Sequence, residues 1–150
     1  MAEDRVTIVV VDDDEGHAEL VRRNLRRAGL SHELVSIRNG GEALDYVFRR
    51  GTHAARKPEG SLILFVDVNM SGSVDGVEVL RQIKADPTTR RLPVIMLTTA
   101  DDPREVDRCY DLGCNVYVTK PVDPGAFSTA IQHLGQILSV ASLPSPGSVG

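Results

Sequence analysis

Three carboxylates, a hydroxyl and an ammonium are placed in this chain where they could bind and transfer a phosphoryl group. Each follows or ends a short apolar run, and the five residues are Asp12, Asp13, Asp67, Thr98 and Lys120. Carboxylates brought close together repel one another by about 3 kcal/mol per pair at an effective dielectric near 20, so such a cluster attracts a divalent cation. Mg²⁺ prefers oxygen ligands and commonly bridges a protein carboxylate to a phosphoryl group.

The chemistry that these residue types favour is transfer of a phosphoryl group to a carboxylate. An ionised carboxylate such as Asp67 can attack phosphorus without a general base, and the product is an acyl phosphate. The transferred group spreads its charge over three oxygens. Mg²⁺, the Lys120 ammonium and the Thr98 hydroxyl could take one oxygen each. We therefore predict that Asp67 is the acceptor and that Mg²⁺ is held by Asp12, Asp13 and Asp67.

These side chains meet only if the apolar runs before them are parallel strands of one sheet. The runs cover residues 8–11, 34–37, 62–66, 94–97 and 116–119. Segments with a helical spacing of apolar residues alternate with the runs, and near-continuous apolar strands need helices on both faces. The pattern predicts an α/β three-layer sandwich of five strand–helix repeats. Open sheets of this kind bind ligands at the carboxyl ends of their strands.

Length, composition and charge narrow the class of protein. From 150 residues we expect one domain over residues 1–138, a flexible Ser-, Pro- and Gly-rich tail over residues 139–150, and no output domain. No stretch approaches the ~20 apolar residues of a membrane span, so we predict cytoplasmic residence without membrane insertion. A net charge of −4 gives no support to direct nucleic-acid binding.

Four ordered motifs together resemble the response-regulator receiver domains of two-component signalling. The motifs are Val11-Asp12-Asp13-Asp14, Phe65-Val66-Asp67-Val68-Asn69, Leu97-Thr98-Thr99-Ala100 and Tyr117-Val118-Thr119-Lys120-Pro121, and the match covers about residues 7–138. The resemblance implies a flavodoxin-like (βα)5 fold with strand order 2-1-3-4-5. It also implies that the backbone carbonyl of Asn69 is a metal ligand and that Tyr117 changes rotamer beside Thr98.

As a receiver, the chain would take a phosphoryl group from a sensor histidine kinase and would signal through a downstream protein or a homodimer. It would assist its own phosphorylation without being a multiple-turnover enzyme. Within the family it looks most like the single-domain regulators that accompany bacterial phytochromes, which implies a phytochrome-like kinase. The loop Met70–Gly76 departs from the family pattern, because it is one residue longer and lacks the customary proline. This change in the loop is expected to affect the rate at which the acyl phosphate is hydrolysed and the fit between the chain and its kinase.

Other functions fit these residues less well. A haloacid-dehalogenase-like hydrolase also uses a strand-end Asp with Mg²⁺, but it needs an acid two residues later, where this chain has Asn69. A flavin or nucleotide binder needs a glycine- or hydroxyl-rich loop where this chain has the acidic run 12–15. A degenerate receiver that only binds partners is disfavoured by the complete residue set. Taken alone, the acidic run would fit a simple helix cap equally well.

The remaining polar residues are interpreted as structural. The four histidines, His17 among them, lack the i, i+4 spacing of metal ligands and are assigned to the surface or to loops. The two cysteines are assigned to helix packing. The basic residues between 49 and 57 are interpreted as a solvated connection, with kinase docking as the alternative.

Overall fold

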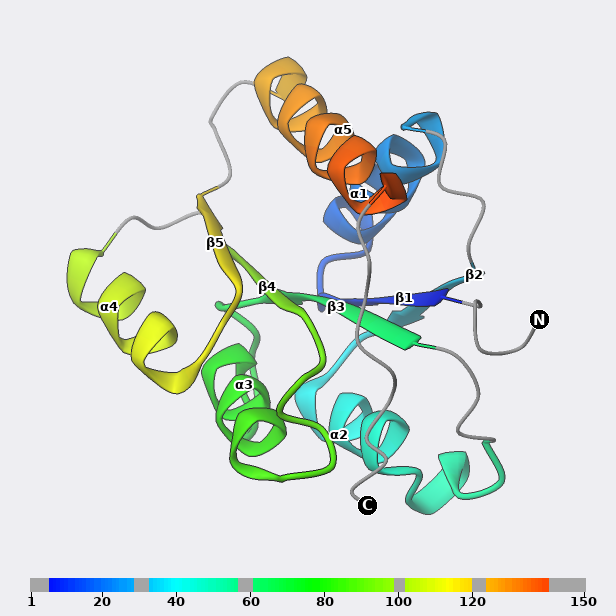
Figure 1. Ribbon diagram of the computed structural model, residues 1–150, viewed down its shortest axis with the longest axis vertical. Helices are drawn as coiled ribbons and strands as arrows, with labels where there is room; N and C mark the ends of the chain where they lie inside the picture. Colours follow the sequence, from blue (N-terminus) through cyan, green and yellow to red (C-terminus); the bar gives the residue numbers. More distant parts are fainter. Residues whose placement is uncertain (1–5, 29–32, 57–60, 99–101, 120–123, 141–150) are drawn as a thin grey trace.

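A five-stranded parallel sheet lies between two layers of helices in the computed structural model, which describes residues 6–28, 33–56, 61–98, 102–119 and 124–140 (Figure 1). The strands are β1 (Val6–Val11), β2 (Glu33–Ile37), β3 (Ser61–Asp67), β4 (Val94–Thr98) and β5 (Val116–Thr119). The helices are α1 (Glu15–Arg27), α2 (Gly40–Phe48), α3 (Gly76–Ala85), α4 (Pro103–Leu112) and α5 (Pro124–Val140), with a short 3-10 turn η2 (Gly51–His53). The sheet order is β2-β1-β3-β4-β5, as predicted.

Alternate strand residues supply two separate halves of the core. Ile8 and Val10 of β1 pack with α1 and α5, whereas Val9 and Val11 pack with α2, α3 and α4. Figure 1 shows the same division, with α1 and α5 on one side of the sheet and the other three helices opposite. All seven residues of β3 are buried, because the central strand is covered on both faces. Among the described residues, no helix is long and apolar enough to cross a membrane.

One basic residue of the connection after α2 is not solvated as the sequence indicated, whereas Arg49 and Arg50 are exposed as expected. Arg56 is partly buried, and its Nε donates to the Tyr46 carbonyl at 3.0 Å near the end of α2. Its guanidinium carbon also lies 4.4 Å from the centre of the Tyr46 ring. A cation near the C-terminal carbonyls of a helix is favourable. Arg56 therefore fastens the connection to α2 instead of extending into solvent.

Gly76, the first residue of α3, touches the backbone of the predicted acceptor. A Cβ atom at this position would lie 2.1 Å from the Asp67 carbonyl oxygen and 2.9 Å from the Val68 Cα. We expect Gly76→Ala to lower the free energy of unfolding by about 1–3 kcal/mol, because backbone has to move to make room. Urea unfolding measures this loss. Gly41→Ala is the matched control, since its nearest contact would be 3.6 Å away; equal stability of the two variants would contradict the packing described.

Alkaline pH should destabilise the fold through a buried thiol. Cys109 and Cys114 close the end of α4, where the Cys114 N–H donates to the Cys109 carbonyl at 3.0 Å. Burial raises the pKa of the Cys109 thiol from 9.0 to about 11. The folded protein then holds this proton more tightly than the unfolded chain. The protonated thiol therefore contributes fully to the free energy of unfolding below pH 9, and this contribution is lost as pH rises towards about 11.

Urea unfolding at about pH 8 and about pH 10.5 tests this sign. The wild-type protein should lose stability over this interval. Cys109→Ala should be less stable at the lower pH, because a cavity forms, but it should lose less on going to the higher pH. An equal alkaline loss in the two proteins would show that other groups cause it.

Candidate functional site

The predicted site residues on β1, β3 and β4 lie at one edge of the sheet. Asp12 directly follows β1, and Asp67 and Thr98 are the last residues of β3 and β4. β1 pairs with β3 up to Val11 beside Val66, and β3 pairs with β4 up to Asp67 beside Leu97. Because these strands are parallel neighbours, the sheet itself brings the three residues together. The sequence-based expectation of one shared edge is confirmed for Asp12, Asp67 and Thr98.

Asp12 and Asp67 form a buried acidic pair. Their exposed fractions are 3% and 6%. One oxygen of each carboxylate and one ring nitrogen of His17 all lie within 4.8 Å of one another. Two carboxylates at this separation repel by about 3 kcal/mol at an effective dielectric near 20. Buried carboxylate oxygens that cost energy when left together suit a divalent cation, which would remove the repulsion.

Local turns hold both carboxylates at the strand ends. Asp12 Oδ1 accepts a hydrogen bond from the Asp14 N–H at 2.8 Å, and Asp67 Oδ1 accepts one from the Asn69 N–H at 3.0 Å. Asp14 in turn caps α1 by accepting from the His17 N–H at 3.1 Å. Asp residues readily form such turns two or three residues ahead. The acidic run 12–15 therefore builds both a helix cap and half of the acidic pair.

Asp13 is engaged by the loop between β3 and α3. Its Oδ2 accepts hydrogen bonds from the N–H and the Oγ of Ser71, each at 3.0 Å. The bond from the Ser71 backbone lowers the pKa of the Asp13 carboxyl. Asp13 is not one of the three residues grouped within 4.8 Å. Its assignment as a metal ligand remains a prediction, and Ser71 belongs to the unusual loop Met70–Gly76.

Thr98 and Tyr117 lie on the two strands between the acidic pair and the β5 edge of the sheet. Thr98 is fully buried, and its Oγ1 accepts a hydrogen bond from Asn69 Nδ2 at 2.8 Å. The Tyr117 hydroxyl lies 3.4 Å from Glu105 Oε1 on α4. Burial, reinforced by the charge of Glu105, raises the pKa of Tyr117 to about 12. Tyr117 is therefore a neutral, partly buried phenol that links β5 to α4.

Lys120 lies outside the described residues, so its predicted place beside the acceptor remains a prediction. The sequence assigns His17 to the surface without a ligand role. Its side chain is indeed 42% exposed, but one of its ring nitrogens also lies within 4.8 Å of carboxylate oxygens of Asp12 and Asp67. The available signal was Asp14, whose position as a helix cap sets His17 in the first turn of α1, facing the strand ends.

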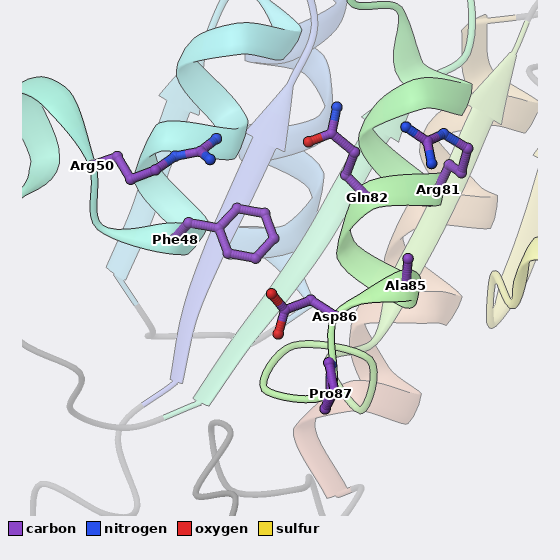
Figure 2. A pocket seen from close by; sticks show the side chains of 7 residues that line it. All are labelled: Phe48, Arg50, Arg81, Gln82, Ala85, Asp86 and Pro87. Atoms are coloured by element: carbon purple, nitrogen blue, oxygen red, sulfur yellow. The ribbon is translucent and has the colours of Figure 1, made fainter.

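A separate hollow of about 610 Å³ lies between α2 and α3 (Figure 2). Its lining residues are Phe48, Arg50, Arg81, Gln82, Ala85, Asp86 and Pro87. These residues come from the C-terminal halves of the two helices and from the residues that closely follow them. Both helices start at the carboxyl edge of the parallel sheet and run back from it, so the hollow lies towards the opposite edge. It contains none of the residues predicted to carry phosphoryl chemistry.

Comparison with known proteins agrees with this geometry. Residues 8–132 match the family described as the response regulator receiver domain. Response regulator Rcp1 from Synechocystis sp. is 35% identical over 113 residues, which cover 75% of each chain. The crystal structure of a response regulator receiver domain from Rhodospirillum rubrum is 43% identical, with a TM-score of 0.86 over 95% of this chain and 99% of that one.

A second solved structure is similar over nearly the same length. It is described as the phosphorylated cyanobacterial phytochrome response regulator RcpA, is 32% identical and has a TM-score of 0.85. The similarity covers 94% of this chain and 99% of that one. The fold of this chain therefore agrees with the folds of these two solved structures over nearly its whole length.

Proposed function

Because the chain belongs to the response regulator receiver domain family and so to phosphorelay signalling, we propose that Asp67 accepts the phosphoryl group. The observation that carries this proposal is the burial of Asp67 at the end of the central strand, close to Asp12, which directly follows the neighbouring strand. The donor would be a sensor histidine kinase. The hydrolase alternative is disfavoured, since it needs an acid where Asn69 donates its amide to Thr98.

The carboxylate oxygens of the site fit a divalent cation, and we propose that this ion is Mg²⁺. Asp12 and Asp67 would hold it, with Asp13 and the backbone carbonyl of Asn69 as further ligands. When bound, the ion supplies positive charge that offsets the negative charge on the carboxylates and on the phosphoryl oxygens. A solved structure of the relative Rcp1 is described as its Mn²⁺-bound form, which supports a divalent site in this chain.

The transfer step uses the Asp67 side chain as nucleophile. A carboxylate oxygen forms a bond to phosphorus as the bond from phosphorus to the donor nitrogen breaks, and the electron pair of that bond stays on the donor imidazole. Burial and the hydrogen bond from the Asn69 N–H keep the carboxylate at the strand end before transfer. Lys120 would pair with a phosphoryl oxygen. Each phosphorylation changes the protein once, so the chain acts as a switch and not as a multiple-turnover enzyme.

Phosphorylation of Asp67 would change the protein surface through movements of Thr98 and Tyr117. A phosphoryl group adds a charge of about −1.5 to −2 at neutral pH and three strong acceptor oxygens. Such a group would draw the Thr98 hydroxyl away from Asn69, which now donates to it at 2.8 Å. Movement of Thr98 changes the space beside Tyr117, whose hydroxyl contacts Glu105 on α4. The surface of α4 and β5 would then bind a downstream protein or a second copy of the chain.

The kinase partner is proposed to be phytochrome-like. The similarity to a protein described as a phytochrome response regulator supports this assignment. Cytoplasmic residence, where such a kinase domain would meet its partner, is part of the same proposal.

Acetyl phosphate tests the proposed function without knowledge of the kinase. Incubation of the whole chain with acetyl phosphate and Mg²⁺ should add one phosphoryl group, read from the intact mass. Addition of EDTA before acetyl phosphate should prevent the gain, because both carboxylates then repel the incoming anion. An unchanged mass in the presence of Mg²⁺ would count against the function proposed.

A further inference from the structure

We propose that His17 is an additional ligand of the divalent cation and shifts the site towards ions that accept nitrogen. This inference rests on the proposed function, because it concerns the same cation. A ring nitrogen of His17 lies within 4.8 Å of carboxylate oxygens of both Asp12 and Asp67. Ligands around one small cation lie about 3 to 4 Å apart, given bonds of about 2.1 Å. Small side-chain rotations would therefore bring all three onto one ion.

The first turn of α1 places the imidazole where a ligand is needed. Asp14 caps the helix by accepting from the His17 N–H at 3.1 Å, which fixes the backbone of His17 relative to the strand ends. The two carboxylates are buried, whereas the side chain of His17 is 42% exposed. His17 is therefore the most exposed of the three residues.

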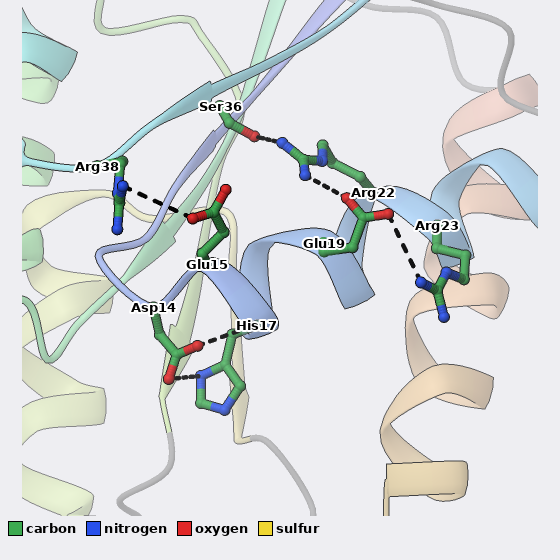
Figure 3. A network of polar contacts seen from close by, with 8 residues as sticks. All are labelled: Asp14, Glu15, His17, Glu19, Arg22, Arg23, Ser36 and Arg38. Atoms are coloured by element: carbon green, nitrogen blue, oxygen red, sulfur yellow. Dashed lines mark hydrogen bonds and ion pairs between the residues drawn. The ribbon is translucent and has the colours of Figure 1, made fainter.

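Asp14 also provides the support that ligating histidines usually have. Its Oδ2 lies 3.8 Å from His17 Nδ1, and a dashed line marks this contact in Figure 3. A metal-bound imidazole commonly turns its second nitrogen to a carboxylate, which fixes the ring and strengthens the ligand. In Figure 3 the Nε2 side of the ring points away from Asp14. The sequence Asp14 to His17 thus combines a helix cap with an outer carboxylate for a histidine ligand.

A nitrogen donor changes which ions the site favours. Mg²⁺ is satisfied by carboxylates, carbonyls and water and gains little from an imidazole. Ni²⁺ and other later transition ions bind imidazole well and follow the Irving–Williams order. A site of two carboxylates and one imidazole should therefore bind Ni²⁺ far better than Mg²⁺, and His17 should account for part of that difference.

Calorimetric titration of the untagged, metal-free chain with MgCl₂ and with NiCl₂ tests this inference. His17→Gln should weaken Ni²⁺ binding at least about 10-fold and should change Mg²⁺ binding less than about threefold. Glutamine suits the third position after a helix cap, so α1 should persist. His133→Gln is the matched control, because His133 is an exposed histidine on α5; it should leave both affinities unchanged.

Pulsed EPR with Mn²⁺ as probe reports the ligand directly. The wild-type protein should show coupling between the bound ion and an imidazole nitrogen, and His17→Gln should lose it. If Mn²⁺ binds without nitrogen coupling, or if His17→Gln weakens Mg²⁺ and Ni²⁺ equally, the inference is wrong while the proposed function stands. If the wild-type chain binds no divalent ion, both fail.

Discussion

Asp67→Asn is expected to abolish the gain of a phosphoryl group from acetyl phosphate. An amide oxygen carries no net charge and is a poor nucleophile towards phosphorus, whereas the ionised carboxylate needs no base. The fold should survive, because the Asn69 N–H donates to Oδ1 of residue 67 at 3.0 Å and an amide oxygen can accept the same bond. The substitution also removes one of two neighbouring buried charges, so the metal-free variant should be at least as stable as the wild type.

Intact mass after incubation with acetyl phosphate and Mg²⁺ measures this effect, with urea unfolding to verify the fold. Asp75→Asn is the matched control in the same loop region. Asp75 caps α3 by accepting from the Glu78 N–H at 2.9 Å, and asparagine caps a helix as well as aspartate does. The control should be phosphorylated like the wild type. Phosphorylation of Asp67→Asn at a rate within about tenfold of the wild type would mean that another residue accepts the group.

Asp12→Asn is expected to weaken Mg²⁺ binding by at least 10- to 100-fold, the range found when even an outer partner of a metal ligand is removed. Asp12 is 3% exposed and lies beside Asp67. Its loss halves the charge of the buried pair and also removes an anionic ligand oxygen, and both changes weaken the attraction for the ion. Because the same repulsion disappears, metal-free Asp12→Asn should unfold at a higher urea concentration than the metal-free wild type.

Calorimetry with MgCl₂ and urea unfolding in EDTA give the two readouts. Glu15→Gln serves as the control, since it removes an equal charge nearby from a side chain that is 74% exposed. This variant should bind Mg²⁺ within about threefold of the wild type, because an exposed charge is screened. If Asp12→Asn and Glu15→Gln weaken Mg²⁺ binding equally, Asp12 is not a ligand and acts only through the negative charge that it adds to this surface.

The fold could be predicted from the sequence because the periodicity of each element agrees with its final burial. Continuous apolar runs such as the one that became β3 need cover on both faces, and Ile8 and Val9 do point to opposite halves of the core. Strand order was implied by family resemblance, and pairing of β1 with β3 confirmed it. The close contact of Gly76 with the Asp67 backbone could not be predicted, since no spacing in the sequence reports the approach of two backbones.

The site was predictable where strand ends alone determine position. Asp12, Asp67 and Thr98 follow this rule, because parallel strands end at one edge. His17 does not, since its place depends on how the cap at Asp14 sets the start of α1. The Ser71 bonds to Asp13 depend on the path of the loop Met70–Gly76, which neither propensity nor charge pattern determines. Side chains on turns and helix ends need tertiary geometry to be located.

Chemical mapping of the phosphorylated residue tests most directly whether Asp67 is the acceptor. Borohydride reduces an aspartyl phosphate to homoserine, and tandem mass spectrometry of the digested chain locates the changed residue. After incubation with acetyl phosphate and Mg²⁺, homoserine should appear at position 67 and nowhere else. Homoserine at position 12 or 13, or a phosphoryl group that stays on a histidine, would contradict the proposed acceptor.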